Sequence, residues 1–247
     1  MTTKPLPAGF VKPDTAAKRR LIVNIQGPEK TGKTDWCLRT GPTPVFHIVL
    51  DPNGLEVAKK IIRDTGREIY TLSIPYSRNM DQAAAVASWN ALWGALEKAL
   101  QYGSGSVVVD SATELDSLCR LAHFGKLEKV PTFKYIERNK DMQAVMSAVY
   151  GSAMNCFFIS KQKKQYTPDS KGESAWNGRY ELAGWDELPY SVQANLRTRM
   201  DEALLTAGEH PFFVHVLVNN MNMDTAGTEY STLDLPFEML LDATFPE

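Results

Sequence analysis

The sequence predicts an α/β protein whose mostly parallel central sheet is flanked by helices. Short apolar runs alternate with helical patterns along most of the chain, which is typical of βαβ units. Several runs are apolar at consecutive positions, as expected of strands covered on both faces. Polar residues end four of these runs, where parallel sheets bind ligands; they are Gln26, Asp51, Asp110 and Ser160.

The individual elements follow from apolar runs, helical spacing and stop residues. Strands are expected where apolar runs lie between turn residues, at 21–26, 44–50, 68–74, 106–111 and 155–160. Helices are expected where a helical pattern runs up to a glycine or another stop, from Lys33 to Gly41 and at 55–65, 81–101, 112–124, 136–150 and 236–243. The segment 51–54 reads as a turn. Residues 195–205 and 212–219 are expected to pair as a C-terminal antiparallel hairpin.

Length and composition favour one domain without a membrane anchor. We expect an extended, proline-containing arm at 1–19, a single domain at 20–247, and within it a mobile basic loop or hairpin at 161–180. The net charge of −2 gives no overall attraction to nucleic acid, so any polyanion site must be local. Three isolated cysteines and the lack of a signal peptide or an apolar span favour a reduced, cytoplasmic protein.

The first strand leads into a sequence that matches the phosphate-binding P-loop. Gly27, Gly32, Lys33 and Thr34 fill the pattern G-x-x-x-x-G-K-[ST] between a strand and a helix. Glycines allow the backbone to approach an anion, and the helix N-terminus adds partial positive charge. Lys33 would contact the β- and γ-phosphates, and Thr34 would bind Mg²⁺. The nucleotide-binding residues are therefore predicted as Gly27, Pro28, Glu29, Lys30, Thr31, Gly32, Lys33, Thr34 and Asp35.

An acid at the end of a second apolar strand is a candidate metal ligand. Val107-Val108-Val109-Asp110-Ser111 has the form of a Walker B strand, and Asp110 could hold Mg²⁺ opposite Thr34. The alternative is an ordinary aspartate that caps the next helix. Asp51 is a further candidate for the metal, or simply a turn residue before Pro52.

These motifs resemble those of RecA-type ATPases, and more closely the small phage-encoded RecA-like P-loop ATPases of the single-strand-annealing type, also described as AAA-family ATP-binding proteins. The resemblance spans roughly residues 20–220 and rests on the P-loop, Leu50-Asp51, 110–115, 158–161 and 188–197. It implies a RecA-like core, ATP with Mg²⁺, a homo-oligomeric ring or filament, and phage recombination on single-stranded DNA. A single-strand-binding protein would be a further partner, and the host cytoplasm the location.

The sequence departs from this pattern at the catalytic glutamate. Asn53 stands where RecA-type enzymes carry that glutamate two residues after the strand-end acid, so Glu56 and Glu114 are the candidates for activating water. The family also places a γ-phosphate sensor at the end of the strand 155–160. Lys161 or Gln162 could fill that role, or could be the first solvated residues of a loop.

Cations and aromatic residues are interleaved in the segment 161–180, where RecA-type proteins carry a DNA-binding loop. Cations that contact phosphates and aromatic rings that stack on bases are typical of single-strand binding. The alternative is a solvated loop whose rings pack on the body. The candidate DNA-binding residues are Lys161, Lys163, Lys164, Tyr166, Lys171, Trp176 and Arg179.

Two arginines share a face of the expected hairpin strand and could act on a neighbouring subunit. Arg197 and Arg199 alternate with Thr198, and an arginine finger from a neighbour stabilises phosphoryl transfer. A surface salt-bridge role is the alternative for each. Two rival functions stay open: a P-loop kinase of small molecules, which would need an arginine-rich lid, and a nucleotide-dependent assembly factor without efficient hydrolysis.

Overall fold

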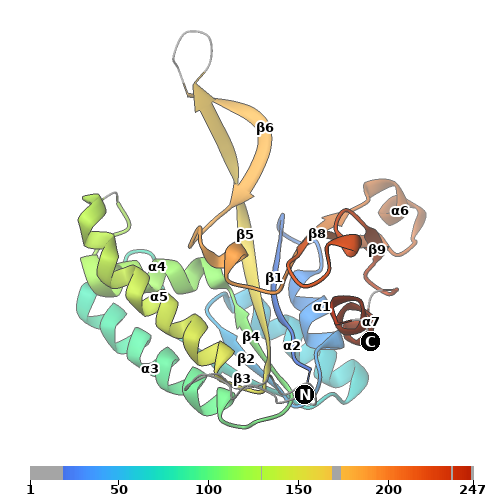
Figure 1. Cartoon of the computed structure of the whole chain (residues 1–247), viewed down its shortest axis with the longest axis horizontal. Coiled ribbons are helices and arrows are strands. Elements are labelled where there is room, and N and C mark those ends of the chain that lie inside the picture. Colours follow the sequence, from blue (N-terminus) through green and yellow to red (C-terminus); the bar gives the residue numbers. More distant parts are fainter. Residues whose placement is uncertain (1–18, 129, 169–173, 235, 246–247) are drawn as a thin grey trace, which may run out of the picture.

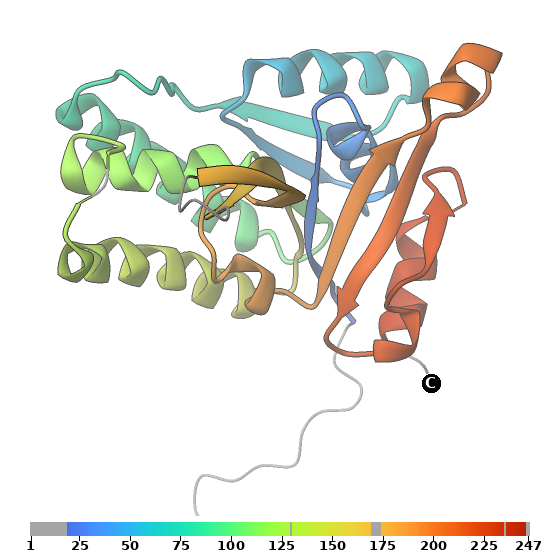
Figure 2. The ribbon, with the colours of Figure 1, turned by 90° about the horizontal axis from the view of Figure 1, so that it is seen from above.

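One central sheet organises the chain, with helices on both of its faces (Figure 1; Figure 2 shows the same ribbon from above). The computed structural model describes residues 19–245 except 129, 169–173 and 235. The strand order is β3-β2-β4-β5-β1-β7-β8-β9, and β6 pairs with β5 outside this path. Neighbours from β3 to β7 run parallel, whereas β8, β9 and β6 are antiparallel to their partners.

The strands and helices follow one another as the sequence predicts through most of the chain. The strands are β1 (Ile22–Gly27), β2 (Val45–Val49), β3 (Ile69–Ser73), β4 (Ser106–Asp110), β5 (Asn155–Pro168), β6 (Ser174–Leu182), β7 (Ala194–Met200), β8 (Phe212–Asn219) and β9 (Glu229–Ser231). The α-helices are α1 (Lys33–Thr40), α2 (Pro52–Thr65), α3 (Gln82–Leu100), α4 (Ala112–Phe124), α5 (Tyr135–Tyr150), α6 (Glu202–Ala207) and α7 (Phe237–Thr244). Short 3₁₀ turns are η1 (Thr132–Lys134), η2 (Leu188–Tyr190) and η3 (Met223–Thr225).

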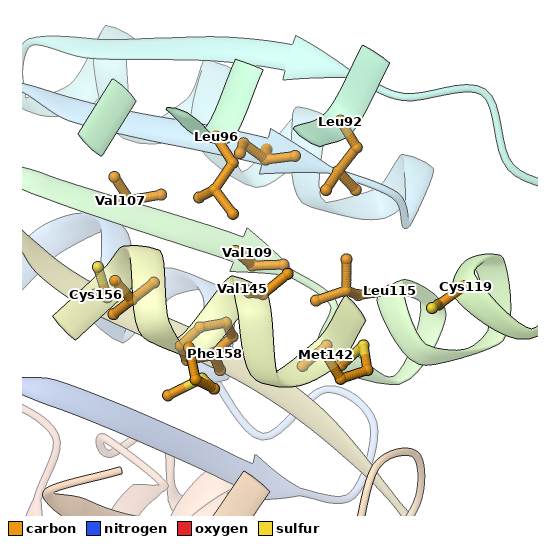
Figure 3. Packing of buried hydrophobic residues seen from close by; sticks show 14 of the residues in the cluster. Leu92, Leu96, Val107, Val109, Leu115, Cys119, Met142, Val145, Cys156 and Phe158 are labelled. Carbon is orange, nitrogen blue, oxygen red and sulfur yellow. The ribbon is translucent and has the colours of Figure 1, made fainter. Parts of the chain in front are cut away.

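Alternation along the central strands divides the core into two layers. Val107 and Val109 of β4 pack with α3, α4 and α5, as Figure 3 shows with Leu92, Leu115 and Val145. Val108 faces the opposite layer, which contains residues of α1, α2 and α7. Because β4 and β5 are covered on both sides, their apolar runs are continuous, as a buried parallel strand requires.

Three local expectations need correction. The strand expected at 195–205 ends at Met200, because Asp201 caps the short helix α6. The turn expected at 51–54 is instead the start of α2: Asp51 is its N-cap and Pro52 its first residue, a position that suits proline. The strand expected at 155–160 continues to Pro168, and of the two alternatives for 161–180, a loop or a hairpin, the described part forms a β-hairpin.

This β-hairpin projects from the carboxyl end of the sheet (Figure 1). We call residues 162–168 and 174–182 the β5–β6 arm. Since β5 is one continuous strand, the arm begins directly after Ser160 and Lys161. The expected extended segment at 1–19 lies outside the described residues except for Arg19. No helix among residues with a described position is long and apolar enough to cross a membrane.

Candidate nucleotide-binding site

The P-loop joins β1 to α1 at the carboxyl edge of the sheet. Gly32 has φ 83°, a left-handed conformation that favours glycine, and it forms the N-cap of α1. The Thr31 hydroxyl lies 2.8 Å from the carbonyl oxygen of Pro28 and 2.6 Å from the Thr198 hydroxyl on β7. These contacts hold the loop against the neighbouring strand. The loop residues 29–32 and the first residues of α1 line one cavity, and a helix N-terminus of this kind favours an anion.

The ammonium of Lys33 lies inside the curve of the loop. It donates to the carbonyl oxygens of Gly27, at 3.0 Å, and of Pro28. Burial lowers the pKa of Lys33, while the carboxylates of Asp110 and Glu29 raise it and the Lys161 ammonium lowers it further. A desolvated cation of this kind interacts strongly with a polyanion that enters the same space.

Asp110 and Thr34 meet across the gap between β4 and α1. The Thr34 hydroxyl donates to Asp110 Oδ2 at 2.9 Å, although 76 residues separate the two in sequence. The strand order explains this contact between Thr34 and Asp110. Only β5 separates β1 from β4, and all three strands run parallel, so their carboxyl ends lie at the same edge of the sheet. Asp110 is only 4% exposed. A hydroxyl and a carboxylate at this spacing are the oxygen ligands that Mg²⁺ prefers.

Two residues that the motifs do not include enclose Asp110. Buried His47 on β2 has Nε2 3.4 Å from Asp110 Oδ2. A Cβ added to Gly54 on α2 would lie 2.4 Å from the same oxygen, closer than Cβ atoms come to such neighbours in real proteins. His47 is the polar exception in the run 44–50, a signal that could have been noticed, but no sequence signal links Gly54 to Asp110.

Three charged groups, Asp51, Lys161 and Glu114, form a row, and the first two of them line the same cavity as Thr34 and Asp110. Lys161 Nζ lies 3.0 Å from Asp51 Oδ2 and 2.8 Å from Glu114 Oε1. The Ser111 hydroxyl donates to the second oxygen of Glu114. Burial opposes the charge on Lys161, but hydrogen bonds to Glu114 and Asp51 outweigh it and raise the pKa of Lys161. The row therefore carries a net negative charge, with its cation fixed in the middle.

The cavity at this edge fits a nucleotide phosphate chain. Its volume is about 370 Å³, within the range of small-ligand sites. Its lining combines the loop with Asp110 and with two members of the charged row, Asp51 and Lys161; it comprises residues 29–35, Asp51, Asn53, Gly54, Val57, Asp110, Ser111, Ile159 and Lys161. Loop amides and Lys33 match phosphate oxygens, and Thr34 with Asp110 matches Mg²⁺. The residues present therefore fit ATP with Mg²⁺.

The predicted site residues divide into those inside the cavity and those outside it. Asp35 lines it and pairs with Arg39 at 2.9 Å. The carboxylate of Asp51 also lines it, but it is engaged by Lys161 and by the backbone N–H of Asn53. Glu56 is not among the lining residues: its carboxylate is 72% exposed and pairs with Lys59 at 2.6 Å.

The two arginines of β7 differ in their surroundings. Arg199 pairs with Glu229 at 2.6 Å and with Asp201 at 3.3 Å, and its guanidinium lies 4.4 Å from the centre of the Phe213 ring. Its charge is thus engaged within its own chain. Arg197 lies opposite Gln26 of β1, next to the P-loop strand, and its Nε is buried without a hydrogen-bond partner in the described part of the chain.

The β5–β6 arm gathers one cation, Lys164, and three aromatic rings on one of its faces. Lys164 lies opposite Tyr180, and Tyr166 lies opposite Trp176. The ammonium of Lys164 is 4.9 Å from the centre of the Trp176 ring, which contacts Tyr180 at 5.9 Å between ring centres. The three rings are 46–56% exposed.

The other predicted DNA-binding residues are placed differently. Lys163 pairs with Glu181 at 3.2 Å, and the Arg179 carbonyl accepts a hydrogen bond from the Trp176 indole. Lys161 is turned toward the cavity rather than toward the arm. Lys171 lies outside the described residues. The face of Lys164, Tyr166, Trp176 and Tyr180 is therefore the exposed aromatic surface of the arm.

Comparison with known structures gives similarities at low sequence identity. Comparison with protein-family models and with curated protein sequences gave no match. The structure of a prototypical ATPase from the type III secretion system of pathogenic bacteria is similar with a TM-score of 0.50 and 9% identity, over 77% of this chain. This chain covers 54% of that protein, so it corresponds to about half of its length.

A second structure is that of the flagellar accessory protein FlaH from Methanocaldococcus jannaschii. The similarity covers 87% of this chain and 84% of the FlaH chain, with 13% identity and a TM-score of 0.40. The sheet order and the similarity to the secretion ATPase together identify a RecA-like fold, with a mostly parallel central sheet flanked by helices and a C-terminal antiparallel pair of strands.

Proposed function

We propose that this protein binds ATP with Mg²⁺ in the P-loop cavity and hydrolyses it. The observation that carries the proposal is the convergence of Lys33, Thr34 and Asp110 on one cavity of the RecA-like fold. Lys33 and the loop amides would hold the phosphates, and Thr34 and Asp110 would hold Mg²⁺. When bound, Mg²⁺ neutralises charge on the phosphate oxygens. Without Lys33, the negative lining would repel the polyanion.

The charged row supplies the groups that would act on the attacked phosphate. Lys161 lines the cavity and would face the terminal phosphate as a fixed cation, worth most where solvent is excluded. Asp51 and Glu114 flank it and are the carboxylates that could orient water. Arg197 or Arg199 from a neighbouring subunit would add charge stabilisation if the protein forms a ring or filament.

Conservative substitutions test which of the three candidate carboxylates, those of Asp51, Glu56 and Glu114, contributes to hydrolysis. Asp51→Asn keeps an N-cap acceptor for α2, and Glu114→Gln keeps the length of the side chain. Glu56→Gln is the matched control, because Glu56 is exposed and outside the cavity. We expect Asp51→Asn and Glu114→Gln each to lower kcat by at least about tenfold, which is less than the full loss expected when a general base is removed. Loss of activity in Glu56→Gln with the others unchanged would contradict this assignment.

We further propose that the aromatic surface of the arm binds single-stranded DNA, in phage recombination or annealing as the sequence resemblance implies. Exposed rings beside Lys164 match the stacking and phosphate contacts of single-strand binding. Replacing Lys163 and Lys164 by Gln should reduce the salt dependence of binding by about 0.7 per contacted phosphate. Lys126→Gln with Lys140→Gln is the control, since it removes two exposed cations away from the arm.

One experiment separates this function from its rivals. Phosphate release from ATP is measured with and without single-stranded DNA, for the wild type and for Lys33→Ala. The proposal expects release that DNA stimulates and that Lys33→Ala abolishes. Binding without release would favour a nucleotide-dependent assembly factor, and transfer to added nucleosides or nucleotides would favour a small-molecule kinase. Release that is unaffected by DNA would remove the DNA role and leave the nucleotide site intact.

A further inference from the structure

A second cluster of ligating side chains lies between α4 and α5, away from the P-loop cavity. Cys119 and His123 are four residues apart on α4, so they lie on the same face of that helix. Asp141 on α5 approaches the same face, and His123 Nε2 is 2.8 Å from Asp141 Oδ2. One ligand atom from each of the three residues lies within 4.8 Å of the other two.

From this cluster we propose that Cys119, His123 and Asp141 bind a zinc ion that links α4 to α5. A thiol, an imidazole and a carboxylate are the three ligand types that zinc takes in proteins. The hard cations Mg²⁺ and Ca²⁺ prefer oxygen alone, so the sulfur ligand distinguishes this site from the predicted magnesium site at Thr34 and Asp110.

The present spacing needs only small side-chain movements to become tetrahedral. Zinc bonds of about 2.0–2.3 Å place neighbouring ligand atoms roughly 3.3–3.7 Å apart. The His123 and Asp141 atoms, now 2.8 Å apart, would separate by about half an ångström. The longest separation, at most 4.8 Å, would close by about 1 Å. Rotation of side chains on two packed helices can supply both changes.

The surroundings provide an entry path and an open coordination position. Cys119 is buried, whereas the side chains of His123 and Asp141 are 27% and 39% exposed. An ion can therefore enter from solvent past the last two ligands, and water can complete the tetrahedron. The Cys119 thiol now lies 3.9 Å from the carbonyl oxygen of Arg138, a weak contact. On coordination the thiol proton leaves to solvent and the sulfur–zinc bond replaces that contact.

The test uses Co²⁺ as a spectroscopic substitute for Zn²⁺ on the full chain without nucleotide. Chelator-treated protein is titrated with Co²⁺ and then with Zn²⁺. We expect one equivalent of Co²⁺ to give a thiolate-to-cobalt charge-transfer band that Zn²⁺ removes. Cys119→Ala should abolish the band, and His123→Ala should weaken Co²⁺ binding by at least about tenfold. A metal at the P-loop cavity has no thiolate ligand among its lining residues, so it would give no such band.

Matched cysteine variants make the outcome decisive. Cys37 and Cys156 are also buried and free, so Cys37→Ala and Cys156→Ala should keep the band. The absence of a band in the wild type, or its persistence in Cys119→Ala, would overturn the proposal. If Cys119→Ala does not fold, His123→Ala provides the test, because His123 is only partly buried. Unchanged affinity for Co²⁺ in His123→Ala would also overturn the proposal. At the same Zn²⁺ concentration, the Tm of the wild type should rise more than that of His123→Ala.

Discussion

A single methyl group at Gly54 should test the position of Asp110. In Gly54→Ala the new Cβ would lie 2.4 Å from Asp110 Oδ2 and 3.2 Å from Asp110 Cγ. The carboxylate has little room to retreat, because Asp110 is 4% exposed and the same oxygen accepts the Thr34 hydroxyl at 2.9 Å. The substitution should therefore displace the carboxylate that we assign to Mg²⁺.

The structure provides a matched control for the helix itself. A Cβ at Gly94 of α3 would have no atom within 4 Å. Gly94→Ala should therefore stabilise the protein by about 0.5–1 kcal/mol, the ordinary gain of alanine in a helix. Gly54→Ala gains at most the same stabilisation, and overpacking against Asp110 lowers its free energy of unfolding by about 1–3 kcal/mol. The two variants should differ by roughly 1–3 kcal/mol in free energy of unfolding, with Gly54→Ala the less stable.

Two measurements together decide the outcome. Urea denaturation gives the stability difference, and titration with a fluorescent ATP analogue gives affinity with and without Mg²⁺. We expect Gly54→Ala to weaken Mg²⁺-dependent binding by about tenfold or more, equivalent to about 1.4 kcal/mol, while binding without Mg²⁺ changes little. If Gly54→Ala matches Gly94→Ala in both stability and affinity, the packing of Gly54 on Asp110 and the metal role built on it are refuted.

Further predictions concern the charged row and the arm. Lys161→Met leaves buried Glu114 without its cation and should destabilise the protein by about 2–3 kcal/mol. This loss is smaller than that for breaking a fully buried pair, because the Lys161 side chain is 33% exposed. A loss of unfolding free energy below about 1 kcal/mol in urea denaturation would contradict the pairing. Burial opposes the charge on Asp51, but Lys161 and the Asn53 N–H outweigh it and lower the pKa of Asp51. The resulting stability is complete above the unfolded pKa of about 3.9 and is lost as the pH falls through the lower folded value. The excess stability of the wild type over Asp51→Asn should therefore shrink below about pH 4, and parallel acid profiles would count against the ion pair. Trp176→Ala should weaken binding of single-stranded DNA by about 1–3 kcal/mol in a fluorescence-anisotropy titration, whereas Tyr190→Ala, which removes an 87% exposed ring outside the arm, should not; equal losses would remove the arm from the DNA site.

Local patterns were enough to predict the sheet and the P-loop. Glycine spacing and the apolar runs are properties of neighbouring residues, so the strand–loop–helix unit around Lys33 could be recognised from the sequence. The approach of Thr34 to Asp110 could also be anticipated, since the P-loop that leads to Thr34 and the residue Asp110 both lie at carboxyl ends of predicted parallel strands.

Other features depend on three-dimensional register and could not be predicted. The contact of Gly54 with Asp110 depends on how α2 packs against β4. The pairing of Lys161 with Asp51 and Glu114 brings three separate elements together, and the sequence predicted Lys161 as a DNA contact as well as a sensor. Helix α6 was missed because its six residues are too few to show a period.

Calorimetric titration of ATP with Mg²⁺ into the wild type and into Lys33→Ala tests the central claim most directly. The wild type should bind one ATP per chain in the presence of Mg²⁺, more weakly when Mg²⁺ is removed. Lys33→Ala should still fold, because the hydrogen bonds of the Lys33 ammonium go to carbonyl oxygens of the loop itself, and it should lose most of the binding. Equal affinity of the two proteins would contradict nucleotide binding at the P-loop.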